Sequence, residues 1–109
     1  MVVYSVRITV QNQIYDQWVE WLKTEHIKEV LACEGFVKAE LRLGKSAVAL
    51  ESSSQEVLVD YYVESDDLLK KYLKEKAMDL RQKGMDLFPG QYSATREVWQ
   101  NNLIISNVH

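Results

Sequence analysis

Hydrophobic and polar positions alternate along four stretches of the chain and recur at helical spacing along two others. The alternation predicts strands near residues 3–10, 36–43, 57–63 and 92–100. The helical spacing predicts one helix that starts near Ile14 and is ended by Gly35, and a second that starts after Ser65. This β-α-β-β-α-β order is that of a ferredoxin-like α+β domain, an antiparallel sheet with two helices on one face. We expect one such domain over residues 1–109, with a short C-terminal tail at residues 101–109.

The ends of the predicted elements are marked by changes in the pattern. Trp18, Leu22 and His26 share one face of a continuous helix, whereas Ile27 and Leu31 fall on the opposite side, so we expect a kink or an end near residues 26–28. Residues 47–50 are expected to extend the hairpin between the second and third strands, with a polar tip at residues 51–55. Ser65 is expected to cap the second helix, which residues 84 and 89–90 close.

The predicted sheet has an apolar face, which the helices cover, and a mixed face, which they leave open. The apolar face comprises Tyr4, Val6, Ile8, Val10, Val37, Ala39, Leu41, Leu43, Val57, Val59, Tyr61 and Val63. The mixed face comprises Val3, Ser5, Arg7, Phe36, Lys38, Glu40, Arg42, Leu58, Asp60 and Tyr62. Large apolar side chains among charges suit an interface or a lined cavity better than a solvated surface. We therefore expect a homodimer that forms through this open face.

Charge and cysteine content exclude several classes of partner. The net charge is -3 and the basic residues are scattered among acids, which argues against a nucleic-acid partner. The one cysteine, Cys33, cannot form an internal disulfide, so we expect a reducing compartment, the cytoplasm. The chain opens without a signal-peptide pattern, and no apolar run approaches the roughly 18 residues of a membrane span, so we expect no membrane partner.

His26 is the sharpest candidate for chemistry because an unperturbed imidazole titrates near neutral pH. It is either a general base or pocket ligand, or a helix-end histidine that bonds backbone carbonyls and packs on aromatic rings. Trp18 falls in the apolar sector and is expected in the core, whereas Trp21 is expected to line a cleft or an interface.

Other motifs add little chemistry. Four charged residues, Arg7, Arg42, Asp60 and Arg96, form either the floor of a cavity or an ion-pair network at a dimer seam. The glycines stand alone, so no phosphate-binding loop is expected, and no nucleophile elbow occurs. Two histidines and one cysteine without ligand spacing predict no metal site. We expect no cofactor.

One segment resembles a known family. Residues 18–36, with the motif Trp-x-x-Trp-x-x-x-x-His-Ile, are similar to a bacterial family of small proteins classed as a domain of unknown function, as are residues 59–65 and 94–96. The resemblance spans about residues 2–100. It implies a dimeric α+β barrel, in which the uncovered sheet faces of two subunits pack together, and it implies no established activity. The chain departs from that family at Lys28, Asp60 and Lys76, where the family usually has proline, glutamine and histidine.

Three classes of function remain. The main hypothesis is a small-molecule-binding or regulatory domain whose pocket includes Trp21, His26 and Tyr72, with Lys76 facing His26 from the second helix. The first alternative is a cofactor-independent enzyme, monooxygenase-like or isomerase-like, with His26 as the catalytic candidate; it rests on analogy of fold. The second alternative is a protein-interaction module. Whether the protein is an enzyme stays open at this point.

Overall fold

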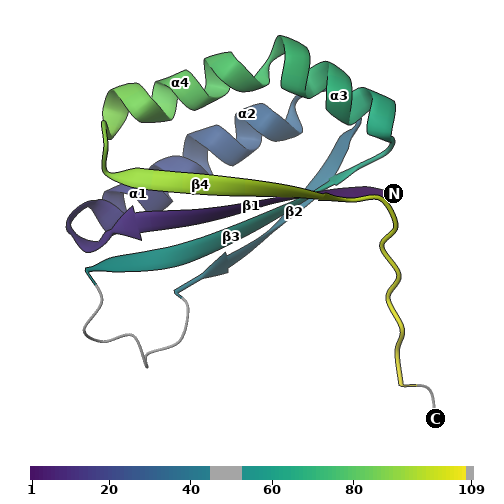
Figure 1. The fold of residues 1–109 in the computed structure, drawn as a ribbon, viewed down its shortest axis with the longest axis horizontal. Coiled ribbons are helices and arrows are strands. Elements are labelled where there is room, and N and C mark those ends of the chain that lie inside the picture. Colours follow the sequence, from purple (N-terminus) through teal and green to yellow (C-terminus); the bar gives the residue numbers. More distant parts are fainter. Residues whose placement is uncertain (45–52, 108–109) are drawn as a thin grey trace.

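The sequence folds into one sheet covered on one face by two helical segments, as the computed structural model shows for residues 1–44 and 53–107 (Figure 1). The elements in chain order are β1 (Val2–Gln11), the 3-10 turn η1 (Asn12–Ile14), α1 (Tyr15–Trp21), the π-helical turn η2 (Leu22–His26), α2 (Ile27–Leu31), β2 (Phe36–Leu43), β3 (Ser54–Val63), α3 (Asp66–Glu75), α4 (Ala77–Leu87) and β4 (Tyr92–Trp99). The predicted α+β class and its ferredoxin-like order are confirmed. The expected hairpin extension at residues 47–50 lies outside the described residues, and residues 54–55 belong to β3 rather than to a polar tip.

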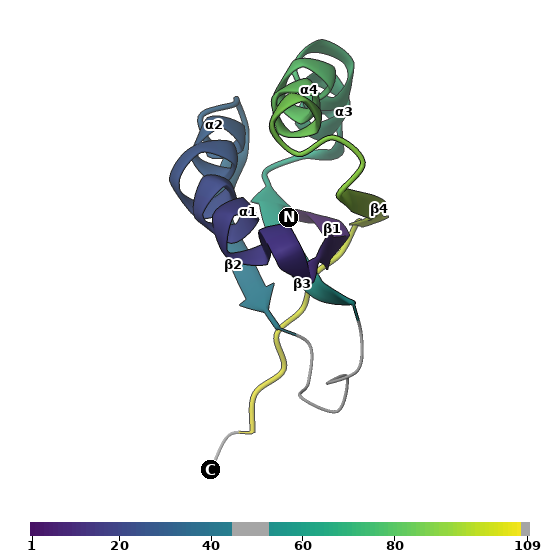
Figure 2. The same cartoon turned by 90° about the vertical axis from the view of Figure 1, so that its left-hand side faces the viewer.

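The strands are antiparallel and lie in the order β2-β3-β1-β4. The central strand β1 pairs with β3 from Val2↔Val63 to Gln11↔Ser54, and with β4 from Val3↔Trp99 to Val10↔Tyr92. All the helices lie on one side of this sheet, with α1 and α2 beside α3 and α4 (Figure 2). The buried core lies between the two layers, and no described helix has both the length and the apolar character to cross a membrane.

The start of β2 corrects the predicted faces. Phe36 was expected on the open face and Val37 on the covered one, but Phe36 is buried and Val37 is 49% exposed. The reason is an irregularity in the pairing: Phe36 lies opposite Val63 and Lys38 opposite Tyr62, which leaves Val37 as an extra residue. Such a bulge shifts the inward and outward alternation by one position.

The first helical segment is continuous but changes its winding. The π-helical turn at Leu22–His26 joins α1 to α2, so the phase change lies within one unbroken segment and not at a helix end. A π turn holds one extra residue, and this rotates the residues that follow it about the helix axis. Both halves therefore bury apolar side chains, among them Trp18 and Val30. Gly35 follows with a φ of 89°, a value that favours glycine.

The second helical segment is divided in two. Ser65 caps α3 as predicted, because its Oγ accepts a hydrogen bond from the Leu68 N–H at 3.2 Å. One continuous helix was expected, but Lys76 has a φ of -123° and separates α3 from α4. Gly84 was expected to close the helix; it lies inside α4 instead and is buried.

The C-terminal tail leaves the body of the subunit. Residues 100–107 have no regular structure and run away from the end of β4 (Figure 1). The apolar side chains of Leu103, Ile104 and Ile105 are 82%, 83% and 90% exposed in the isolated chain.

Candidate functional site

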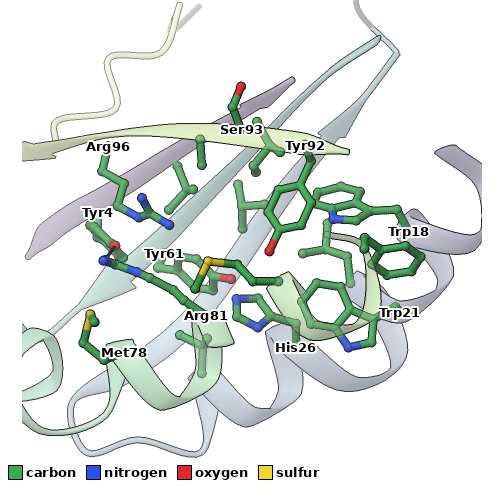
Figure 3. Close-up of a pocket in the computed structure, with 18 of the residues that line it drawn as sticks. Tyr4, Trp18, Trp21, His26, Tyr61, Met78, Arg81, Tyr92, Ser93 and Arg96 are labelled. Atoms are coloured by element: carbon green, nitrogen blue, oxygen red, sulfur yellow. Dashed lines mark hydrogen bonds between the residues drawn. The ribbon is translucent and has the colours of Figure 1, made fainter. Parts of the chain in front are cut away.

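A cavity of about 530 Å³ lies between the sheet and the helices. The sheet contributes Tyr4, Val6, Ile8, Val59, Tyr61, Tyr92, Ser93, Ala94 and Arg96, the first helical segment contributes Trp18, Trp21, Leu22, His26 and Val30, and the remainder of the lining is Tyr72, Met78, Arg81, Met85, Phe88 and Gly90. Figure 3 shows most of these side chains around one space. We call it the His26 cavity. Apolar and aromatic walls with a few polar groups are typical of small-molecule sites.

The π-helical turn positions the two residues that the sequence analysis singled out. Trp21 precedes the turn and His26 ends it, and their rings stack with centroids 4.9 Å apart and an interplanar angle of 29°. On a regular α-helix, residues five apart point about 140° away from each other. The extra residue of the π turn brings them onto one face, so both line the His26 cavity.

Gly84 allows α4 to lie close to this aromatic pair. A Cβ added at Gly84 would lie 2.5 Å from the Tyr92 Oη and 2.7 Å from the Trp21 Cη2, distances that real side chains do not occupy. The absent side chain therefore lets three elements meet around one end of the cavity. Phe88, on the last turn beyond Gly84, contacts Trp21 edge to face at 6.1 Å.

The environment of His26 keeps its imidazole neutral. Burial is the main reason that the pKa of His26 is lowered to about 4, and the positive charges of Arg96, Arg81 and Lys83 lower it further, against an opposing effect of Glu29. The expectation that His26 titrates near neutral pH is therefore wrong, because the sequence did not reveal this burial or the nearby cations. At pH 7 the ring carries one acceptor nitrogen and one donor nitrogen.

Two arginines give the cavity its charge. Arg81 extends from α4 and donates a hydrogen bond from Nη2 to the Tyr4 Oη at 3.0 Å. Arg96 lies opposite Val6 in the β1–β4 pairing, so it is on the covered face of the sheet. Figure 3 shows both guanidinium groups directed toward the space beside Tyr4.

The tyrosine hydroxyls of the cavity stay protonated. Burial raises the pKa of Tyr61 and of Tyr72 well above the ordinary phenol value, and it raises the pKa of Tyr92 as well. These groups can therefore donate hydrogen bonds to a ligand. The Nε1 of Trp18 is buried without a hydrogen-bond partner among the described residues.

The structure brings together three of the four expected ligand-binding residues. Trp21, His26 and Tyr72 line the His26 cavity, but Lys76 does not. Lys76 is exposed at the break between α3 and α4 and lines a separate hollow with Cys33 and Glu75. Lys76 does not face His26 because the second helical segment breaks at this residue. Lys76 was expected to lie on the helix face that lines the cavity, and that expectation required a continuous helix.

The charged cluster proposed from the sequence is divided between the two faces of the sheet. On the open face, Arg42 donates to the Asp60 Oδ2 at 3.2 Å, and Asp60 also accepts from the Ser5 hydroxyl. Arg96 lies on the other face and contributes to the His26 cavity. No group of histidine, cysteine, aspartate and glutamate side chains arranged to hold a metal occurs within residues 1–44 and 53–107.

Arg81 was not predicted as a site residue from the sequence, and Arg96 was assigned to the wrong set of residues. A signal for Arg96 was present, because it shares the inward phase of its strand with Tyr92 and Ala94. A charge on an otherwise apolar inward face is informative. Arg81 shares a helix face with Ala77, Gly84 and Phe88, which was visible only once the start of α4 was known.

The family is decided by a comparison of the whole chain with family models. The model described as "Domain of unknown function (DUF4286)" matches residues 1–101. The chain belongs to this family. The resemblance inferred from the helix motif is thus supported at the level of a domain of unknown function. A comparison with curated proteins finds no match.

Solved structures with the same fold cover nearly the whole chain of this DUF4286 protein. One is a putative antibiotic biosynthesis monooxygenase from Bacillus cereus, with 19% identity, a TM-score of 0.65 and coverage of 97% of each chain. Another is an ethyl tert-butyl ether D family protein from Bacillus halodurans, with 13% identity, a TM-score of 0.68, and coverage of 94% of this chain and 100% of the other. A third is a variant of SnoaB, a cofactor-independent oxygenase from Streptomyces nogalater, with 8% identity, a TM-score of 0.68, and coverage of 97% and 98%. At these identities the likeness shows the fold alone, an antiparallel α+β sheet with helices on one face.

Proposed function

We propose that this DUF4286 protein binds a small, largely apolar molecule in the His26 cavity, in a ligand-binding or regulatory role. The cavity carries this proposal: its volume of about 530 Å³ lies within the range of small-molecule sites, roughly 300–1,000 Å³. Aromatic rings from three elements offer stacking surface, and the hydroxyl of Tyr61 and the imidazole of His26 are available for hydrogen bonds.

A thermal-shift screen of a ligand library tests this proposal. Compounds that raise the melting temperature of the wild-type protein are expected to lose most of that effect on Trp21→Ala and His26→Ala proteins. The control is Trp99→Ala, which removes a 58% exposed tryptophan from the open face of the sheet. Hits that stabilise all four proteins equally would place the site elsewhere, and a screen without hits would favour the interaction-module alternative.

We also propose that the functional unit is a homodimer formed through the open face of the sheet. This face carries Leu58, Tyr62 and Trp99 beside the Arg42–Asp60 ion pair, a mixture found at interfaces. Two such faces would bury on the order of 1,500 Å², enough for a stable dimer. The His26 cavity lies on the opposite side of the sheet, so dimerisation would leave it open.

A cofactor-independent enzyme is the second candidate, favoured by one specific observation. A neutral imidazole and two guanidinium groups share the His26 cavity, so His26 could accept a proton while Arg81 and Arg96 stabilise the anion that forms. A pKa of about 4 makes His26 a weak base, however, which places ligand binding ahead of proton transfer. Solvent-deuterium exchange into screening hits, measured with wild-type and His26→Gln proteins, separates the two. Exchange that depends on His26 would show that the protein catalyses proton transfer. A ligand that binds without exchange would support the binding role alone.

A further inference from the structure

Among the described residues, the two arginines of the His26 cavity lack the acidic partners that several surface cations have. On the surface, Arg42, Lys71 and Lys83 each form an ion pair with a carboxylate. Arg81 bonds a neutral phenol oxygen, and Arg96 forms no ion pair with any described residue. Among the described residues that line the cavity, none is an aspartate or a glutamate. The cavity therefore holds two positive charges without a negative one.

These charges act on the interior of the cavity. The positive charge of Arg96 lowers the pKa of His26 and the pKa values of three phenols, those of Tyr61, Tyr72 and Tyr92. On the phenols this effect opposes burial, which raises the pKa. The positive charge of Arg81 lowers the pKa values of His26 and Tyr72. Arg81 is half-buried, so solvent screens its charge less than that of a group on an open surface, whereas Arg96 is exposed and its charge is screened more strongly. An anion that enters the cavity is thus stabilised at the end where Arg81 and Arg96 lie.

The rest of the cavity is suited to a flat apolar body. Trp21, with His26 stacked on it and Phe88 at its edge, forms an aromatic wall. The side chains of Met78 and Met85 lie at the exposed side, where thioethers adapt to different shapes. A ligand that uses both ends combines one charged group with an aromatic ring.

We propose that the ligand is an aromatic carboxylate, whose carboxyl group lies between Arg81 and Arg96 and whose ring packs against Trp21 and Phe88. This inference rests on the function proposed for the cavity and names its ligand class. A guanidinium group presents paired N–H donors that match the two oxygens of a carboxylate, and such charge-assisted bonds are about twice as strong as neutral ones. Binding also provides the counterion that the protein itself does not place in the cavity.

Matched pairs of probes test the ligand class. Each pair is a carboxylate and its neutral amide: 2-naphthoate with 2-naphthamide, and 9-anthroate with 9-anthramide. Isothermal titration at pH 7 is expected to show that the wild-type protein binds at least one acid ten or more times as tightly as its amide. Arg96→Gln and Arg81→Gln should each reduce that preference to threefold or less, whereas Arg42→Gln, which removes a paired arginine from the open face, should leave it unchanged. Circular dichroism confirms that each variant is folded.

The outcomes separate this inference from the proposed function. If an amide binds as tightly as its acid and Trp21→Ala abolishes the binding of both, the proposed ligand class is overturned. The assignment of the binding site to the His26 cavity would then still stand. Preference for the acid that survives both arginine substitutions would overturn the assignment to Arg81 and Arg96. Tighter binding of 2-naphthylphosphonate than of 2-naphthoate would overturn the carboxylate in favour of a phosphorus acid. A library screen without hits, together with no binding in either pair, would contradict the proposed function itself.

Discussion

The ring of His26 stacks on the ring of Trp21 at a centroid distance of 4.9 Å, although the two residues are five positions apart along the helix. This contact depends on the π-helical turn at Leu22–His26. π turns of this kind occur frequently at functional sites, because they redirect a side chain without ending the helix. The same turn explains why the apolar residues that follow His26 in the sequence no longer fall on the helix face of those before it. A local irregularity of the backbone thereby places the imidazole in the cavity.

The lowered pKa of the half-buried His26 predicts how stability depends on pH. The pKa of His26 is about 4 in the folded protein, against an ordinary value of 6.5, so between these values the unfolded chain takes up a proton that the folded chain does not. The free energy of unfolding should therefore fall as the pH falls through this range, by an amount on the order of 2 kcal/mol. Urea unfolding of wild-type and His26→Gln proteins at pH 7 and pH 4.5 measures it, and the variant should show a smaller difference between the two pH values. An equal difference in both proteins would count against the buried neutral imidazole.

Gly84 occupies a helix position at which we expect alanine to lower the stability of the protein. Alanine at an ordinary position inside a helix is more favourable than glycine by about 1 kcal/mol. At Gly84, the new Cβ would approach the Tyr92 Oη to 2.5 Å and the Trp21 Cη2 to 2.7 Å, so we expect Gly84→Ala to lower the free energy of unfolding by roughly 1–3 kcal/mol.

The matched control removes the nearest clashing atom. The double variant Gly84→Ala, Tyr92→Phe lacks the hydroxyl oxygen and should recover part of the lost stability relative to Tyr92→Phe alone. Urea unfolding provides all the values. A Gly84→Ala protein that is more stable than wild type would show that the close packing at α4 is not as described.

The strand pattern was sufficient to predict the fold, because covered positions on β1 and β3 alternate without interruption. Tyr4, Ile8, Val59 and Tyr61 are buried as predicted. Alternation failed at the start of β2, where Phe36 and Val37 are both apolar and the pattern alone cannot locate a bulge. Ser65 was predictable as a cap since its role depends on neighbouring residues only.

The site was harder to predict than the fold, because it depends on irregular backbone. Trp21 and His26 were selected for their residue types, but their contact required a π turn that no sequence signal specified. Lys76 was assigned to the cavity on the assumption of a continuous helix, and no glycine or proline marks the break that turns it away. Arg96 is on the covered face because strand register places it opposite Val6, and the predicted faces did not include β4.

Dimerisation through the open face predicts the mass of the particle in solution. Light scattering at micromolar concentration should give twice the subunit mass of 12.7 kDa. Trp99→Ser should weaken the dimer because Trp99 lies on the open face, opposite Val3 in the pairing. Leu87→Ser is the control, since Leu87 is an exposed apolar residue of α4 with a similar exposure of 55% against 58%. A monomeric wild-type protein, or equal weakening by both substitutions, would contradict this interface.

The C-terminal tail is expected to cover the partner subunit or an edge strand. The side chains of Leu103, Ile104 and Ile105 are almost fully exposed in the isolated chain, and burial of even one of them is worth roughly 1.5–3 kcal/mol. Truncation after Asn102 should therefore weaken dimerisation about tenfold or more, as measured by sedimentation equilibrium. Replacement of the three residues by serine should have the same effect at full length. An unchanged dissociation constant with an unchanged melting temperature would refute this role.

The indole N–H signals of the three tryptophans test the central claim, that a small molecule binds in the His26 cavity, most directly. Trp18 and Trp21 line the cavity, and Trp99 lies on the open face of the sheet, so the chain carries two reporters and one internal control. Titration of the ¹⁵N-labelled protein with the tightest hit of the screen should shift the Trp18 and Trp21 signals with one common dissociation constant and leave the Trp99 signal in place. Movement of the Trp99 signal while those of Trp18 and Trp21 stay fixed would contradict the account.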